Sequence, residues 1–256
     1  MTEARAREGH THEITGDLRL RRPGIYGKRL ASKQVDGFGM SDFASRRVMM
    51  VDTQVRPSDV TKFPIIEAML SVPRELYVPE DRREAAYVGE NLPLGGGRVL
   101  LEPRTMAKLL DALDLRPGEL VLALGCGLGD STGVIARLAG TVFGVEDDES
   151  MAADAQRLLS EEGVDNALVV TGPLVVGSAK HAPYDAITIQ GGVEELPEAV
   201  VGQLKDGGRI GAVFMDGPLG VAKVGYKSDG KVTWRAAFNA TAPILDGFRK
   251  ARAFAL

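Results

Sequence analysis

Three closely spaced glycines follow a short apolar run in the stretch VLALGCGLGD. Gly125, Gly127 and Gly129 let the chain turn tightly after a strand, and they let a ligand approach the backbone without a Cβ atom in the way. Asp130 or Ser131 then stands where the cap of a helix is expected. The Gly-x-Gly-x-Gly spacing differs from the Gly-x-Gly-x-x-Gly of dinucleotide sites. The residues therefore predict a turn that receives a nucleotide-like cofactor other than a dinucleotide.

A carboxylate is expected beside this glycine turn. Glu146 ends the next apolar run, TVFGVE, where it can accept hydrogen bonds from both hydroxyls of a ribose. Each such charge-assisted hydrogen bond contributes about 1.5–3 kcal/mol. The alternative interpretation of Glu146 is an ordinary solvated strand end. Asp147, which follows directly, and Gly172, after the run NALVVT, are predicted to contact the cofactor as well.

The other reactive residue types predict little chemistry. Cys126 lies between two of the glycines, and we interpret it as a small residue lining the cofactor site, not as a nucleophile. His10 and His12 lack a third ligand nearby in the sequence, and His181 stands alone before the run YDAITI. The sequence therefore predicts no metal site, and it interprets His181 as a solvated loop residue.

The segments around the glycine turn must form a sheet to position it. From about residue 116 onward, apolar strand-like runs alternate with helical patterns, which is typical of a mostly parallel sheet covered by helices on both faces. The later run GVAKVGYKSDGKVTWRAAF predicts two strands joined at residues 228–230 as an antiparallel hairpin. Its Trp234 and Phe238 are expected to pack on the sheet and not to form a peptide-binding surface. The predicted fold class is α/β, a Rossmann-like class I methyltransferase fold with a seven-stranded sheet and N-terminal helices.

The domain prediction follows from a change in composition. Residues 1–39 are mildly basic and carry no sustained apolar periodicity, so they are predicted to be a flexible extension. Residues 40–256 are predicted to be one domain: a helical part over residues 40–115, in which Ser41 caps the first helix, and a cofactor-binding sheet over residues 116–256.

Composition limits the classes of function. The chain has 256 residues, a formal net charge of −4 and one cysteine. Nothing in this charge balance favours a nucleic acid partner, and a single cysteine excludes an internal disulfide. We find no apolar run near the roughly 18 residues of a membrane span and no apolar block of a signal peptide at the N-terminus. The sequence therefore predicts a cytoplasmic protein without a membrane partner.

Several motifs in order resemble one known family. The segments VDTQVRP, VPRELYVPEDRREAAY, LPLGGG, GCGLG with VE, APYDAITI and VEELPEAVVGQLKDGGRIGAV are similar to the protein-L-isoaspartate O-methyltransferase family. The resemblance implies one class I methyltransferase domain that uses S-adenosyl-L-methionine. It implies a reaction that esterifies the carboxylate of isoaspartate in a damaged protein or peptide, which starts the repair of that protein.

The resemblance also places an acceptor loop, and three contact positions depart from the family pattern. Leu101 stands where the family has a serine beside the acceptor carboxylate, and Glu102 and Arg104 follow as candidate substrate contacts or as an exposed ion pair. Ala123 and Pro173 replace two acids that contact the cofactor, and Asp130 is the candidate substitute for the first. Leucine donates no hydrogen bond, and proline offers neither a carboxylate nor an amide hydrogen. Reduced activity is therefore expected.

The sequence leaves two interpretations of the function open. The first is a methyltransferase with reduced activity. The second is a methyltransferase fold that serves as a binding or scaffolding module without catalysis. A short-chain dehydrogenase is disfavoured, because no tyrosine in the sequence is followed four residues later by lysine.

Overall fold

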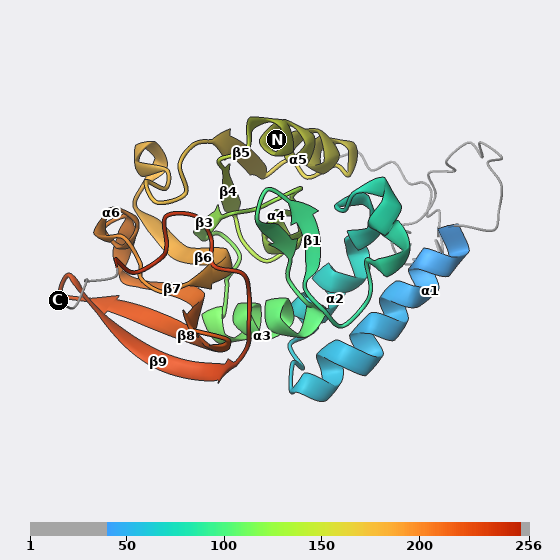
Figure 1. The fold of residues 1–256 in the computed structure, drawn as a ribbon, viewed down its shortest axis with the longest axis horizontal. Coiled ribbons are helices and arrows are strands. Elements are labelled where there is room, and N and C mark those ends of the chain that lie inside the picture. The colour runs from blue at the N-terminus through green and yellow to red at the C-terminus, as the bar shows by residue number, and fades with distance from the viewer. Residues whose placement is uncertain (1–39, 252–256) are drawn as a thin grey trace, which may run out of the picture. The chain divides into compact units, whose positions relative to one another are not determined.

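The structure is a computed structural model that describes residues 40–251 (Figure 1). The predicted extension over residues 1–39, with His10 and His12, lies outside the described residues. By its internal contacts the chain divides between Asp36 and Gly37, and the described residues belong to the second unit. In the part of the chain that is described, no helix is both long and apolar enough to cross a membrane.

Short helices make up the N-terminal part. Helix α1 (Met40–Met50) continues into a π-helical turn (Val51–Val55) and a 3-10 turn (Arg56–Ser58), and α2 (Phe63–Ser71) follows. The helix α1 begins at Met40, so Ser41 lies inside it, and the prediction of Ser41 as its cap is wrong. The segment PRELYVPEDRREAAY forms two 3-10 turns, Arg74–Leu76 and Glu80–Ala85. A proline precedes each turn, where it cannot extend a helix from the preceding residues.

In the order of the chain, a small hairpin follows these helices and precedes the main sheet. Strands β1 (Leu92–Gly95) and β2 (Arg98–Leu100) pair with each other and form a two-stranded antiparallel sheet of their own. The glycines that end the LPLGGG motif lie at the tip of this hairpin. Helix α3 (Pro103–Leu113) follows and begins with its proline, which suits the first turn of a helix.

The main sheet has seven strands in the order β5-β4-β3-β6-β7-β8-β9. Its parallel strands are β3 (Leu120–Leu124), β4 (Thr141–Glu146), β5 (Ala167–Thr171), β6 (Tyr184–Val193) and β7 (Leu204–Asp216). The connecting helices are α4 (Asp130–Ala136), α5 (Glu149–Glu161) and the single turn α6 (Glu198–Val201), with a 3-10 turn at Ala179–His181. From β3 the chain adds β4 and β5 on one side, and it then returns to place β6 on the other side of β3. The strand order therefore reverses between β3 and β6, and a ligand is expected at the carboxyl ends of these two strands.

Two antiparallel strands close one side of the sheet. Strands β8 (Leu219–Ser228) and β9 (Lys231–Asn239) form the predicted hairpin, which turns at Asp229 and Gly230 with φ values of 51° and 72°. The Trp234 ring packs edge-on against Phe214 with ring centroids 4.8 Å apart. In Figure 1 these strands lie at the end of the molecule away from α1. The fold-class prediction is confirmed.

The core lies on both faces of the central strands. Along β3, Val121 and Ala123 pack with the N-terminal helices, whereas Leu122 and Leu124 pack with a second cluster that includes Leu245 from the segment after β9. Alternate side chains of one strand point to opposite faces, so a strand covered on both faces needs a continuous apolar run. This requirement explains why VLAL could be recognised as a buried strand.

Candidate cofactor and acceptor site

The glycine turn has the shape that its residues predict. Gly125, Gly127 and Gly129 adopt φ values of 71°, 56° and 101°, which side-chain-bearing residues rarely adopt. The N–H of Gly125 donates to the carbonyl oxygen of Val145 at 2.9 Å, and the N–H of Gly129 donates to that of Cys126 at 3.0 Å. The turn is therefore fixed to the end of β4, and α4 starts directly after it. Gly129 is the N-cap of α4, so the prediction of Asp130 or Ser131 as the cap is wrong.

Glu146 lies against this turn at the end of β4. Its Oε2 accepts the N–H of Gly127 at 2.8 Å, and its Oε1 accepts the N–H of Asp147 at 3.0 Å. The N–H of Gly172 donates to its backbone carbonyl at 2.9 Å. Burial raises the pKa of the Glu146 carboxyl, and a nearby arginine opposes this rise. The structure thus brings the predicted cofactor residues Glu146, Asp147 and Gly172 to one edge of the sheet beside the glycine turn.

That arginine, Arg98, was not predicted. It begins β2, directly after the three glycines of the hairpin tip, and its Nε donates to Glu146 Oε1 at 2.9 Å. Its Nη2 donates to Asp147 Oδ1. The Arg98 side chain is 3% exposed and the Glu146 side chain 0% exposed. The carboxylate expected to hold a ribose is therefore already bonded to the protein.

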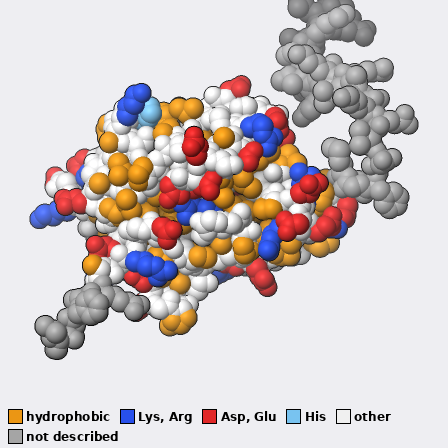
Figure 2. Space-filling view, turned by 45° about the horizontal axis from the view of Figure 1, so that its top comes forward, with side chains coloured by type: hydrophobic (Ala, Val, Ile, Leu, Met, Phe, Trp, Pro, Cys, Tyr) orange, Lys and Arg blue, Asp and Glu red, His pale blue; other side chains and the backbone are white. Residues whose placement is uncertain are grey.

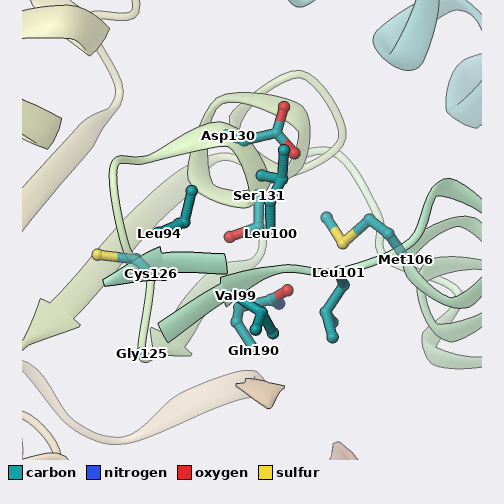
Figure 3. A pocket seen from close by; sticks show the side chains of 10 residues that line it. All are labelled: Leu94, Val99, Leu100, Leu101, Met106, Gly125, Cys126, Asp130, Ser131 and Gln190. Carbon is teal, nitrogen blue, oxygen red and sulfur yellow. The ribbon is translucent and has the colours of Figure 1, made fainter. Parts of the chain in front are cut away.

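The cavity beside the turn is small (Figure 3). Leu94 and Cys126 lie on one side of it and Leu101 and Met106 on the other, with Gln190 of β6 beneath. Its volume is about 10 Å³. About 10–15 Å³ is needed for one water molecule, whereas sites for drug-sized ligands and cofactors typically measure about 300–1,000 Å³. In this conformation the site has the turn and the carboxylate for a cofactor but not the space.

Asp130 is bound within the protein. Its Oδ2 accepts a hydrogen bond from Arg74 Nη1 at 2.7 Å, and both side chains are buried. The same guanidinium donates to the carbonyl oxygens of Leu101 and Ala86. Asp130, the candidate substitute for an acid in the strand, therefore tethers the start of α4 to the 3-10 turn of Arg74 and to the loop of Leu101. This pair was also not predicted.

The acceptor loop divides between the cavity and the surface. Leu101 is buried and faces the cavity, while Glu102 and Arg104 form a partly exposed ion pair at 3.7 Å. Arg104 also donates to the carbonyl oxygen of Asn239 at 3.3 Å and lies over the ring of Phe238. Of the three candidate substrate residues, only Leu101 lies beside the glycine turn. Glu102 and Arg104 line a separate open groove of about 420 Å³.

The remaining candidate residues lie in surroundings that do not activate them for chemistry. Burial raises the pKa of the Cys126 thiol to about 12, so it is not an activated nucleophile. The interpretation of His181 as a solvated loop residue is wrong: it is half-buried at the end of a 3-10 turn, its ring stacks on Phe143 with centroids 4.0 Å apart, and its Nδ1 lies 3.0 Å from Ser178 Oγ. Ala123 is fully buried, between Gly144 of β4 and Thr188 of β6. Among the described residues, no group of three or more His, Cys, Asp or Glu side chains could hold a metal ion.

Sequence comparisons define the family. The family model described as Protein-L-isoaspartate(D-aspartate) O-methyltransferase matches residues 47–235. A protein-L-isoaspartate O-methyltransferase of Syntrophus aciditrophicus is 38% identical over 171 residues, which are 67% of this chain and 78% of that protein. One of Pelotomaculum thermopropionicum is 34% identical over 189 residues, which are 74% of this chain and 81% of that protein.

Solved structures agree on the fold. A structure titled protein-L-isoaspartate O-methyltransferase has a TM-score of 0.68 at 24% identity and covers 80% of this chain and 66% of its own. A Plasmodium falciparum protein, titled as a putative member in complex with S-adenosyl-L-homocysteine, has a TM-score of 0.67 at 19% identity and covers 80% of this chain and 98% of its own.

The sheet order, the glycine turn and the carboxylate at the end of β4 define a class I methyltransferase fold, the class whose cofactor is S-adenosyl-L-methionine. Within that class, the chain belongs to the protein-L-isoaspartate(D-aspartate) O-methyltransferase family. The family resemblance of the motifs, and the cofactor that it implies, are thereby confirmed.

Proposed function

We propose that this protein transfers a methyl group from S-adenosyl-L-methionine to the carboxylate of isoaspartyl residues in proteins or peptides, at a reduced rate. The observation that carries the proposal is the pairing of the glycine turn with Glu146 in a chain of this family. A carboxylate beside an open backbone turn suits a ribose diol and an attached chain that passes over the glycines.

The fit of the cofactor is partial in the described conformation. The turn and Glu146 suit one end of the cofactor, whereas the cavity of about 10 Å³ does not admit the rest. A cofactor must therefore displace side chains that now fill this space. When bound, it supplies a methyl group on a positively charged sulfur.

The residues of the chain act mainly by positioning. The acceptor carboxylate is already ionised at neutral pH, so little acid or base assistance is needed and alignment dominates the rate. Leu101 faces the site and offers no hydrogen-bond donor to that carboxylate. Glu102 adds a negative charge near the loop, which Arg104 partly offsets at 3.7 Å. These features support a lower rate through weaker orientation of the acceptor.

The decisive experiment measures transfer of a labelled methyl group to a peptide that contains one isoaspartyl residue. The matched control is the same peptide with aspartate in its place. We expect slow transfer to the first and none to the second. The Glu146→Gln variant should lose most of it, because an amide NH₂ cannot accept hydrogen bonds as the carboxylate does. Equal labelling of both peptides would contradict the proposed acceptor.

The second candidate function is a binding or scaffolding module without catalysis. The small cavity favours it, because a volume of about 10 Å³ is far below what a cofactor occupies. Calorimetric titration with S-adenosyl-L-methionine and S-adenosyl-L-homocysteine separates the two functions. Absence of heat at millimolar ligand would favour the module, since both the reduced and the full enzyme require cofactor.

The setting of this function is inferred from charge and cysteine content. On the face shown in Figure 2, basic and acidic side chains are interspersed, which does not favour a nucleic acid partner. The single cysteine, Cys126, is buried and free, which suits the reducing cytoplasm that we infer as its compartment.

A further inference from the structure

Arg98 contacts both carboxylates at the ribose end of the site. It donates from Nε to Glu146 and from Nη2 to Asp147, and it is nine-tenths or more buried. A guanidinium offers donors in a fixed planar fork, so one side chain can engage two carboxylates at once. The contact ties the β1–β2 hairpin to the end of β4, 48 residues away in the sequence.

This contact competes with a ribose for the same atoms. Glu146 Oε1 accepts from Arg98, from the N–H of Asp147 at 3.0 Å and from the N–H of Asp148 at 3.4 Å, which leaves it no free lone pair. Oε2 accepts the N–H of Gly127, and the whole side chain is 0% exposed. A ribose hydroxyl cannot reach Glu146 until the Arg98 side chain leaves.

The hairpin that carries Arg98 also covers the glycine turn. Leu94 Cδ1 lies only 2.8 Å from the position that a Cβ atom on Gly127 would occupy. The backbone face that should receive the cofactor is therefore in contact with a leucine of β1. The hairpin therefore contacts the cofactor site at two places, through Arg98 at Glu146 and through Leu94 at Gly127.

The hairpin shares no backbone ladder with the main sheet, and it packs on the core through the buried side chains of Leu92, Leu94 and Leu100. Its ladder joins only β1 and β2, and it contributes no strand to the seven-stranded sheet. At its tip, a Cβ atom added to Gly95 or Gly97 would meet nothing within 4 Å. The base is held by a hydrogen bond of 2.9 Å from the N–H of Glu102 to Asn91 Oδ1. Opening would then break side-chain contacts while the sheet remains intact.

We propose that Arg98 is an intrachain latch that holds the β1–β2 hairpin closed over the cofactor site, so that S-adenosyl-L-methionine binds only after Arg98 releases Glu146. This inference rests on the proposed function, because it assigns the control of the same site. A closed state that excludes the ligand lowers its apparent affinity by the fraction of molecules that are open.

The test is a calorimetric titration of the full chain and of Arg98→Gln with S-adenosyl-L-homocysteine. If the closed state outnumbers the open state by about ten to one, release of the latch tightens binding about tenfold. The matched control is Arg209→Gln, which breaks the half-buried two-point pair of Arg209 with Glu119 far from the turn. The control should lower the melting temperature without changing affinity. Unchanged or weaker binding by Arg98→Gln overturns the latch.

A second measurement needs no cofactor. Hydrogen exchange of the amides in residues 92–100 should accelerate in Arg98→Gln, while exchange in β3 to β7 stays unchanged. If Arg98→Gln does not fold, Arg98→Lys replaces it, since lysine keeps the charge but loses the planar fork. Exchange in residues 92–100 that matches the wild type overturns the latch.

The two measurements separate the latch from the proposed function. Tight binding by the wild type with no gain in the variant overturns the latch and leaves the function standing. If exchange in residues 92–100 is faster in the variant but neither protein binds S-adenosyl-L-homocysteine, cofactor binding is contradicted, and with it the proposed enzymatic function. This outcome also overturns the latch as the control of cofactor binding.

Discussion

Leu101 affects both the proposed reaction and the packing of the core. Its side chain is 4% exposed, lies beside the glycine turn and supplies bulk at the position where the family resemblance implies a serine. Ala123, by contrast, is 0% exposed in the middle of β3. A carboxylate placed there would be buried without a prepared partner, so restoring that acid is a poor test of function.

We predict that Leu101→Ser increases methyl transfer to an isoaspartyl peptide about tenfold, because a regained hydrogen bond contributes roughly 1.5 kcal/mol in the transition state. The same change should lower the free energy of unfolding by about 2–3 kcal/mol, since it removes a buried aliphatic side chain. Initial rates are measured well below the melting temperature.

The matched control for this substitution is Leu101→Ala, which creates the same space without a hydroxyl. An equal gain in both variants would attribute the effect to space and would contradict the role assigned to the hydrogen bond.

Cys126 should be inert in the folded protein. Its pKa of about 12 leaves almost no thiolate at pH 8, whereas an unfolded cysteine has a pKa near 8.5. We predict that a disulfide reagent such as dithionitrobenzoate modifies Cys126 at least a hundred times more slowly in buffer than in denaturant. Rapid modification of the native protein would show that the thiol is accessible or activated.

At the scale of elements, Arg74 joins three segments through one buried guanidinium. It bonds to Asp130 at the start of α4, to Leu101 in the acceptor loop and to Ala86 after the second 3-10 turn. Burial raises the pKa of Asp130 and lowers that of Arg74, while their mutual attraction opposes both shifts. The pair is therefore a strong constraint with a large desolvation cost.

We predict that Arg74→Met destabilises the protein by about 3–5 kcal/mol, because it leaves a buried carboxylate unpaired. The double variant Arg74→Met/Asp130→Leu should recover much of this loss. Because Asp130 then has a folded-state pKa above its unfolded value, the folded protein gains protons more readily, and the deficit of Arg74→Met should shrink from pH 8 to pH 5.

Denaturant unfolding at the two pH values measures this prediction. A deficit that is constant with pH, or a double variant that is as unstable as the single one, would contradict it.

The elements differ in how far the sequence could predict them. The strands β3 to β6 were predictable because continuous apolar runs end at glycines or acids, and parallel strands end at one edge, which also placed Glu146 near the glycine turn. The β1–β2 hairpin was predictable only as a turn, since its proline and glycines have little strand propensity. The pairs of Arg98 with Glu146 and Arg74 with Asp130 join residues 48 and 56 positions apart. No local pattern encodes such partners.

At the scale of the whole molecule, the two largest core clusters of the described residues lie on opposite faces of the central strands. We predict that deletion of residues 1–39 changes the melting temperature by less than a few degrees, because that segment offers few apolar residues to a core. Scanning calorimetry of the full and shortened chains measures this. A larger decrease would show that the segment packs against the domain.

The separateness of the β1–β2 hairpin also affects rates. If ligand enters only through molecules whose hairpin is already open, the observed rate of association approaches the rate of hairpin opening at high ligand concentration, whatever the ligand. In a stopped-flow experiment S-adenosyl-L-methionine and S-adenosyl-L-homocysteine would therefore share one plateau. Their different dissociation rates would still distinguish them, so a two-stranded ribbon outside the main sheet would set the rate at which either ligand enters, but not the rate at which it leaves.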